Sequence, residues 1–443
     1  MRCRFLRVLL LAALLAPGLA ACAARGADPS LDARLRRIIA PVRFSIPRWQ
    51  IERLPDVFSV PSLGDLTAEQ KAVLVRYYFA LGQEARARER ALTLQKGADG
   101  ITCAHCEEDD LQTLMARYQA MRPVVQRAIA EQLEEALRQE GLANPAPGWL
   151  SRETIFPPVR FVLEGPPHVL VISPRERIER LREFLGVGDL SPAQQGALER
   201  QVEALDSALA PYGLSALVVE IGGFGGTFPT FVSDESSLHY ALGAIAEEWL
   251  HQYLAFTPLG SRYVLHLLNL ARNDEIARLN ETAADLAAGE LRDQIIARHY
   301  ADLAPRPAPA EAPAAPQQPA PKRFNFGRYM RETRLEVDRL LAEGQVAQAE
   351  AYMEQRRQGL LQEGYAIRRL NQAYFAFHGT YAASEFSLDP ETGRSIDPIG
   401  EEMVALRAQS SSVGEFVRAV SRLTSREALR RALANARRWP TPR

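Results

Sequence analysis

Side chains that can bind a metal or move a proton are gathered in one apolar stretch of the sequence. Residues 240–256 read YALGAIAEEWLHQYLAF, and Glu247, Glu248 and His251 stand there among mostly apolar neighbours. A stretch that is apolar almost all round predicts a largely buried helix. Because buried charge without a partner is costly, these side chains need partners in the folded protein.

The spacing within this stretch is that of two metal ligands on one helix. Glu247 and His251 are four residues apart, so they lie one turn from each other on the same face. Glu248, one position round the helix, stands where a base acting on metal-bound water would stand. The alternative is a surface helix with a Glu–His pair at i,i+4, which the apolar surroundings disfavour.

Two segments together resemble a peptidase family. Residues 247–251 resemble the His-Glu-x-x-His helix of zinc peptidases, with Glu247 in place of the first His. Asn280-Glu281-Thr-Ala-Ala-Asp285 resembles the Asn-Glu-x-x-x-Asp segment on the next helix of the gluzincins, the thermolysin-like clan (peptidase MA). Taken alone, the second segment would also suit a helix start capped by Asn280, with Glu281 in the first turn.

The resemblance implies a role for each matched residue. The metal ligands become Glu247, His251 and Glu281, the general base becomes Glu248, and Asp285 becomes a supporting residue behind the first ligand. The strand-like residues 214–221 and 228–232 come just before the motif helix, where the family has an edge strand that holds a peptide by backbone pairing.

Glu247 changes the expected metal chemistry. Zinc accepts carboxylates but prefers His and Cys, and a Glu/His/Glu set would also suit Mn or Fe(II). Asp285 would then face another carboxylate instead of an N–H, so one of the two acids should have a raised pKa. The alternative is that the site has lost its metal and that the protein is a pseudo-peptidase.

A second aromatic segment offers candidates for oxyanion stabilisation. Residues 371–381 read NQAYFAFHGTY, with His378 and Tyr381 on either side of Gly379. Peptidases of this clan often bring a His or Tyr from a later helical domain to the oxyanion, and the resemblance implies this role for His378 and Tyr381. The alternative is a helix C-terminus near Gly379, with the aromatic residues in the core.

The first residues resemble the signal peptide of a bacterial lipoprotein. Arg2, Arg4 and Arg7 precede an apolar run over 6–19, and Leu19-Ala-Ala-Cys22 follows. The resemblance implies cleavage before Cys22, lipidation of its sulfur, and a protein anchored to a membrane of the cell envelope on the extracytoplasmic side. The alternative is an ordinary secretory peptide.

The rest of the sequence predicts an α+β fold that is rich in helix. We expect a helical region over 22–150, a catalytic core over 151–303 with a small, mostly antiparallel sheet packed on the motif helices, a Pro/Ala-rich linker over 304–323, and a helical region over 324–443. Within these we expect helices over 66–94, 111–137, 192–209 and 365–377, and strands over 159–163 and 168–172.

Composition limits the class of function. The chain has 443 residues, 53 basic and 54 acidic side chains, and a net charge of −1, so no basic surplus supports nucleic-acid binding. The sequence therefore predicts a membrane-anchored, metal-dependent peptidase that acts on a peptide or protein substrate. The alternative is a metal-free pseudo-peptidase or a scaffold lipoprotein that binds peptide or envelope protein.

Overall fold

The structure of this protein is a computed structural model that describes most of residues 29–436. The ranges 59–62, 97–103, 146–150, 302–323 and 379–397 are not described, nor are the short stretches 152, 189, 207–208, 221–222, 225, 235–236, 268–269, 272 and 366. The predicted signal peptide, Cys22, the linker over 304–323 and Tyr381 therefore lie outside the described residues.

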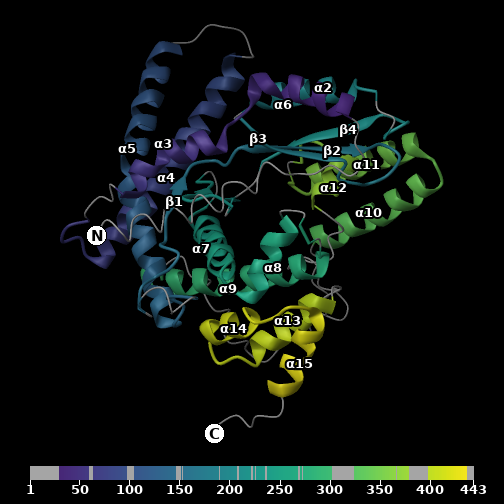
Figure 1. Ribbon diagram of the computed structural model, residues 1–443. Helices are drawn as coiled ribbons and strands as arrows, with labels where there is room; N and C mark the ends of the chain where they lie inside the picture. The colour runs from purple at the N-terminus through teal and green to yellow at the C-terminus, as the bar shows by residue number, and fades with distance from the viewer. Residues whose placement is uncertain are drawn as a thin grey trace, which may run out of the picture.

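The fold class predicted from the sequence is confirmed. Helices dominate the described chain, six short strands form its sheets, and helical regions stand at both ends (Figure 1). In the part of the chain that the structure describes, no helix is both long and apolar enough to span a membrane.

The N-terminal region consists of helices, as its three-four periodicity predicts. They are α2 (Pro29–Ile39), the short 3-10 helix η2 (Ala40–Val42), α3 (Ile46–Phe58), α4 (Ala68–Lys96) and α5 (Ala104–Gln139). The rings of Tyr78 on α4 and Tyr118 on α5 stack at 4.4 Å, and both hydroxyls donate to the carboxylate of Asp234. Because Asp234 shortly precedes the motif helix, this network ties α4 and α5 to the start of that helix.

The strands form two small sheets. β2 (His168–Pro174) lies between β3 (Arg182–Val187) and β4 (Leu214–Val219) in an antiparallel sheet. In the other sheet, β6 (Thr230–Val232) pairs in parallel with β1 (Phe161–Leu163) and antiparallel with β5 (Gly223–Phe224). β3 has no counterpart in the sequence prediction, because REFLGV mixes charged, apolar and Gly residues without a clear alternation.

The β3–β2–β4 sheet is covered on both faces, as the period of two in its strands requires. Leu170 and Val218 point to the core formed with α2 and α6 (Pro192–Glu203). Val169 and Val219 point the other way, to a core formed with α10 (Phe326–Ala342), α11 (Val346–Gln362) and α12 (Gln372–His378). Figure 1 shows these helices on opposite sides of the sheet. Both faces of this sheet are therefore covered by other helices. The second sheet, β1–β6–β5, is the one that contacts the motif helix.

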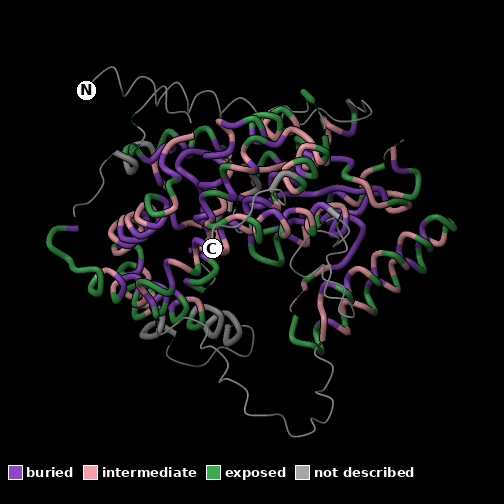
Figure 2. Tube along the Cα trace, turned by 90° about the horizontal axis from the view of Figure 1, so that it is seen from below, coloured by how far each residue is buried: buried purple, intermediate pink, exposed green. Residues whose placement is uncertain are grey.

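The largest core surrounds the motif helices. It contains α7 (Leu238–Leu254), α9 (Asp274–His299) and the C-terminal helices α13 (Pro398–Ala408), α14 (Val413–Val420) and α15 (Arg426–Ala436). α8 (Pro258–Leu267) connects α7 to α9. Gly260 lets α8 approach the end of α7 closely, since a Cβ there would lie 2.2 Å from the carbonyl oxygen of Leu254. Figure 2 shows the buried backbone running through the middle of the molecule.

Candidate metal centre

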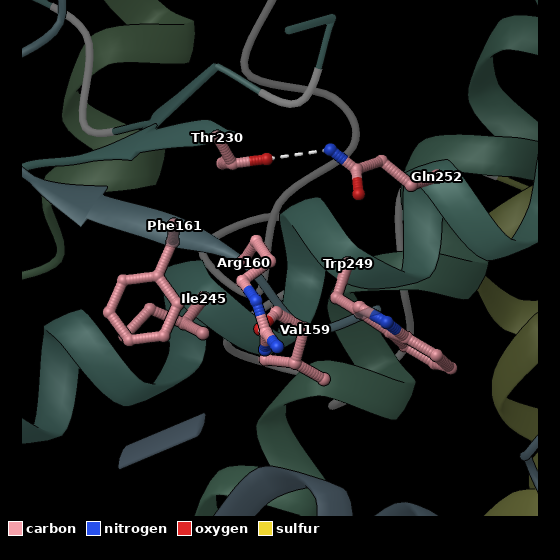
Figure 3. Close-up of a pocket in the computed structure, with 7 residues that line it drawn as sticks. All are labelled: Val159, Arg160, Phe161, Thr230, Ile245, Trp249 and Gln252. Atoms are coloured by element: carbon pink, nitrogen blue, oxygen red, sulfur yellow. Dashed lines mark hydrogen bonds between the residues drawn. The ribbon is translucent and has the colours of Figure 1, made fainter. Parts of the chain in front are cut away.

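One face of α7 is fastened to the β1–β6–β5 sheet. Gln252 Nε2 donates to Thr230 Oγ1 at 2.7 Å and to the carbonyl oxygen of Thr227 at 2.9 Å, and Trp249 Nε1 donates to the carbonyl oxygen of Pro157 at 2.8 Å. Together with Ile245, these side chains line a small pocket between α7 and the sheet (Figure 3). At 100° per residue, positions 245, 249 and 252 share one side of the helix, so the pocket lies behind the helix and away from Glu247 and His251.

The opposite face of α7 meets α9, whose start is not where the second motif alone would suggest. α9 begins at Asp274, and the side chain of Asn273 caps it by accepting from the backbone N–H groups of Glu275 at 3.0 Å and Ile276 at 3.1 Å. Asn280 therefore lies inside the helix, where its side chain is fully buried. The alternative of Asn280 as a helix cap is wrong, because the capping residue comes seven positions earlier.

The three predicted ligands converge. Glu247 and His251 on α7 and Glu281 on α9 each offer a ligand atom, and these atoms lie within 4.8 Å of one another. His251 Nε2 is 4.0 Å from Glu247 Oε1 and 3.6 Å from Glu281 Oε2. The His251 side chain is 16% exposed and that of Glu281 is 51% exposed, so solvent reaches the group from one side. This Glu–His–Glu group could hold a metal ion.

Asn280 sets the orientation of the imidazole. The Nδ1 atom of His251 lies 2.8 Å from Asn280 Oδ1. Since an amide oxygen only accepts, Nδ1 carries the proton and donates, which points Nε2 at the two carboxylates. A histidine ligand commonly has its second nitrogen fixed in this way. The sequence prediction gave Asn280 no such role, because the contact joins two helices.

The electrostatics of the group favour a cation. Burial, with the carboxylates of Asp285 and Glu281 and against the opposing effect of His251, raises the pKa of Glu247 to about 7. Burial alone would lower the pKa of His251, but Glu281, Glu248 and Glu247 outweigh it and the pKa is raised. Carboxylates thus outnumber the single imidazole, as the replacement of the first His by Glu247 predicts.

Tyr263 on α8 is a site residue that the sequence prediction missed. Its hydroxyl donates to Glu281 Oε1, and its ring centroid lies 5.9 Å from that of His251 in a stacked arrangement. Burial and the carboxylate of Glu281 raise the pKa of Tyr263, so the phenol keeps its proton at neutral pH. Tyr263 therefore leaves the other oxygen of Glu281, Oε2, to face His251. No motif marks this residue, and only the close packing of α8 against α7 and α9 brings it here.

Glu248 and Asp285 lie close to this group without belonging to it. Glu248 is half-buried on α7, and its charge is near enough to raise the pKa of His251. Asp285 is exposed on α9, one turn after Glu281, and its charge contributes to the raised pKa of Glu247.

Of the two predicted oxyanion residues, the structure describes only His378. His378 is the last residue of α12, and its ring centroid lies 4.3 Å from that of Tyr374. α12 packs on β2 and β4, and Phe375 is fully buried there, which agrees with the alternative of a helix C-terminus with aromatic residues in the core. Tyr381 lies outside the described residues.

Comparisons with protein-family models, with curated proteins and with solved structures found no match to this chain.

Proposed function

We propose that this protein is a metal-dependent peptidase of the gluzincin type, in which metal-activated water hydrolyses a peptide or amide bond. The observation that supports it best is the convergence of Glu247, His251 and Glu281 from two helices to within 4.8 Å. These are the three positions that the two motifs imply as ligands. The motifs also follow each other along the sequence in the order found in the family.

The donor set suits a divalent cation. Imidazole and carboxylate groups bind Zn, and a set with two carboxylates also accepts Mn or Fe. A cation held here would supply Lewis acidity to polarise the scissile carbonyl. The side chains around the group support binding, since Asn280 holds the imidazole and Tyr263 holds one oxygen of Glu281.

Proton transfer falls to Glu248 in this proposal. Its carboxylate stands one position round the helix from Glu247, half-buried beside the ligand group. It would take the proton of the attacking water and pass it to the leaving amine, a role for which carboxylates are well suited. The assignments of His378 and Tyr381 to the oxyanion, and of Cys22 to a lipid anchor in the cell envelope, stay predictions.

The test is the metal content of the purified protein beside two variants. We expect about one equivalent of a transition metal in the wild type, none in His251→Ala, and full occupancy in Glu248→Gln. Hydrolysis of a mixed peptide library should fall by about 10²- to 10⁴-fold in Glu248→Gln, as expected for the loss of a general base.

The opposite result would reject the enzyme. If the wild type holds no metal and takes up neither Zn nor Mn, the peptidase proposal fails. A metal-free protein that binds peptide or envelope protein, or a scaffold, would then be the better description.

A further inference from the structure

The contact between α7 and α9 continues beyond the metal ligands to a cationic side chain. His251 contacts Asn280 and Glu281, whereas Gly243 of α7 lies beside Arg292 of α9. The residue numbers fall along one helix as they rise along the other, so the two helices are antiparallel. Arg292 therefore lies beside the part of α7 that precedes the ligands Glu247 and His251.

Arg292 lies on the same side of α9 as Glu281. Eleven residues separate them, which at 100° per residue places their side chains about 20° apart around the helix and about 16 Å apart along it. Side chains of a helix lean toward its N-terminus, so the guanidinium of Arg292 leans back toward Glu281. Its Nη2 atom does lie over the preceding turn, 3.7 Å from the Cβ position of Gly289. The guanidinium is thus on the order of 10 Å from the ligand group.

Two glycines next to this guanidinium have no packing reason to be glycine. At several other helical glycines a Cβ would collide with a neighbour, at 2.6 Å for Gly82, 2.2 Å for Gly260 and 1.7 Å for Gly414, although at Gly196 of α6 it would not. At Gly243 and Gly289 the nearest atoms are those of Arg292, at 3.6 and 3.7 Å, which is ordinary contact distance. Glycine inside a helix costs about 0.5–1 kcal/mol relative to Ala. The two positions therefore leave room for a methyl-sized group on both sides of one cation, at a cost to the helices.

The protein leaves the far end of Arg292 without an acceptor. Its Nε atom donates to Asp293 Oδ1 at 2.9 Å. Among the described residues no acceptor lies within hydrogen-bond distance of Nη1 or Nη2, although the Arg292 side chain is only 26% exposed. A guanidinium edge with two free donors matches the two oxygens of a carboxylate.

We infer that Arg292 binds a carboxylate of the peptide substrate, in the space left by Gly243 and Gly289. This inference rests on the proposed peptidase function and names its substrate class, peptides that carry a carboxylate two to three residues from the cleaved bond. An extended peptide spans about 3.3 Å per residue, so that number of residues covers the distance from Arg292 to the ligand group. Two sources supply the same chemistry: the α-carboxylate at the end of a peptide, and the side chain of Asp or Glu within one.

The charge of the ligand region explains why a substrate carboxylate would bind away from it. Glu247, Glu248, Glu281 and Asp285 give the ligand region a surplus of carboxylates, which would repel an acidic substrate. The guanidinium of Arg292 binds the substrate carboxylate at a distance from them and fixes the register of the peptide.

The experiment measures peptide binding to the Glu248→Gln protein by calorimetry, with and without added Zn, so that hydrolysis does not interfere. Three short peptides of otherwise equal sequence serve as probes: one with a free C-terminus, one amidated, and one amidated with a Glu in place of a neutral residue. We expect at least one carboxylate-bearing peptide to bind about 10- to 100-fold more tightly than the neutral amidated peptide, as charge-assisted hydrogen bonds allow. Which of the two binds tightly identifies the source of the carboxylate.

Variants test whether Arg292 causes the difference. Arg292→Gln should remove the preference, whereas Arg298→Gln on the same helix should retain it, because Arg298 pairs with Glu135 at 2.7 Å instead. Gly289→Ala should raise the thermal stability of the protein while weakening binding of the carboxylate peptide, a combination that a purely structural role would not give.

Failure of this inference is distinct from failure of the peptidase proposal. Equal binding of all three peptides, no binding of any of them, or a preference that survives Arg292→Gln would overturn the role of Arg292 while leaving metal content and hydrolysis to be judged separately. A preference that depends on Arg292 in a protein without metal or hydrolysis would uphold the carboxylate site and reject the enzyme.

Discussion

Two regions of this molecule hold partly or fully buried carboxylates, and they balance the charge in opposite ways. Glu199 on α6 is 1% exposed, and it receives Arg368, Arg369 at 3.3 Å, and the backbone N–H of Val218 at 2.8 Å. Glu247 and Glu281 share the imidazole of His251, and within the described chain neither forms an ion pair with Lys or Arg.

The difference separates a structural ion pair from a binding site. A buried charge is tolerated when the protein itself supplies partners, and Glu199 joins α6 to the segment before α12 across the end of β4 in that way. The carboxylates between α7 and α9 have no such arginine partners among the described residues, so this group could hold a cation from solution.

The largest effect on stability should come from removing Glu199, the buried carboxylate that the protein pairs with its own arginines. Glu199→Ala leaves two arginines and a buried N–H without their acceptor, so we expect a loss of about 3 kcal/mol in the free energy of unfolding. Urea denaturation measures this, and the metal content should not change. Glu354→Ala, which removes an exposed partner of Arg357, should cost less than about 0.5 kcal/mol. A loss for Glu199→Ala as small as that of the control would contradict the comparison.

Binding of a metal ion to Glu247, His251 and Glu281 should stabilise the folded protein by a similar amount. A metal that binds only the folded state adds about 2.7 kcal/mol to the free energy of unfolding at a concentration 100 times its Kd. Thermal and urea unfolding of chelator-treated protein, with and without Zn or Mn, give the value. His251→Ala should show no such gain, and an equal gain in that variant would place the metal elsewhere.

The residue that orients the ligand should matter for metal affinity. Asn280→Ala removes the acceptor of His251 Nδ1, so we expect the Kd for metal to rise about 10- to 100-fold. Asn371→Ala is the matched control, since Asn371 is also a buried amide and donates to the carbonyl oxygen of Ala216 at 3.0 Å. Equal metal affinity in Asn280→Ala and Asn371→Ala would show that Asn280 has no part in the site.

The smallest effect should come from the phenol on α8. Tyr263→Phe removes one hydrogen bond to Glu281, so metal affinity should fall by about 1 kcal/mol. Tyr329→Phe loses a hydrogen bond to the carbonyl oxygen of Arg356 in the α10–α11 pair and should leave metal affinity unchanged. Titration with a chromophoric competitor resolves a difference of this size, and an unchanged Kd in Tyr263→Phe would limit its role to packing.

Most of the elements could be predicted from local patterns, and the exceptions have physical reasons. The predicted helix over 66–94 corresponds to α4, and the strand over 168–172 corresponds to β2. The expected helix over 365–377 is shorter, because only Gln372–His378 is helical and the residues before it make tertiary contacts. There Arg368 reaches Glu199 and Asn371 reaches Ala216. Such contacts compete with the local helical preference, and the sequence pattern does not contain them.

The sequence by itself determined the relation between Glu247, Glu248 and His251. Residues three or four apart on one helix are neighbours by helix geometry alone, and the apolar residues around them require that the helix be buried. The resemblance also named Glu281, although the alternative of a capped helix start stayed open until the structure placed the cap at Asn273.

Only the tertiary structure decided how the helices meet. The partnership of Asn280 with His251, the hydrogen bond from Tyr263, and the position of Arg292 beside Gly243 all join different helices. Contacts of this kind depend on how α7 is fastened to its sheet and how closely Gly260 lets α8 approach. Those are properties of packing between segments distant in sequence, which the spacing of residues along one helix does not specify.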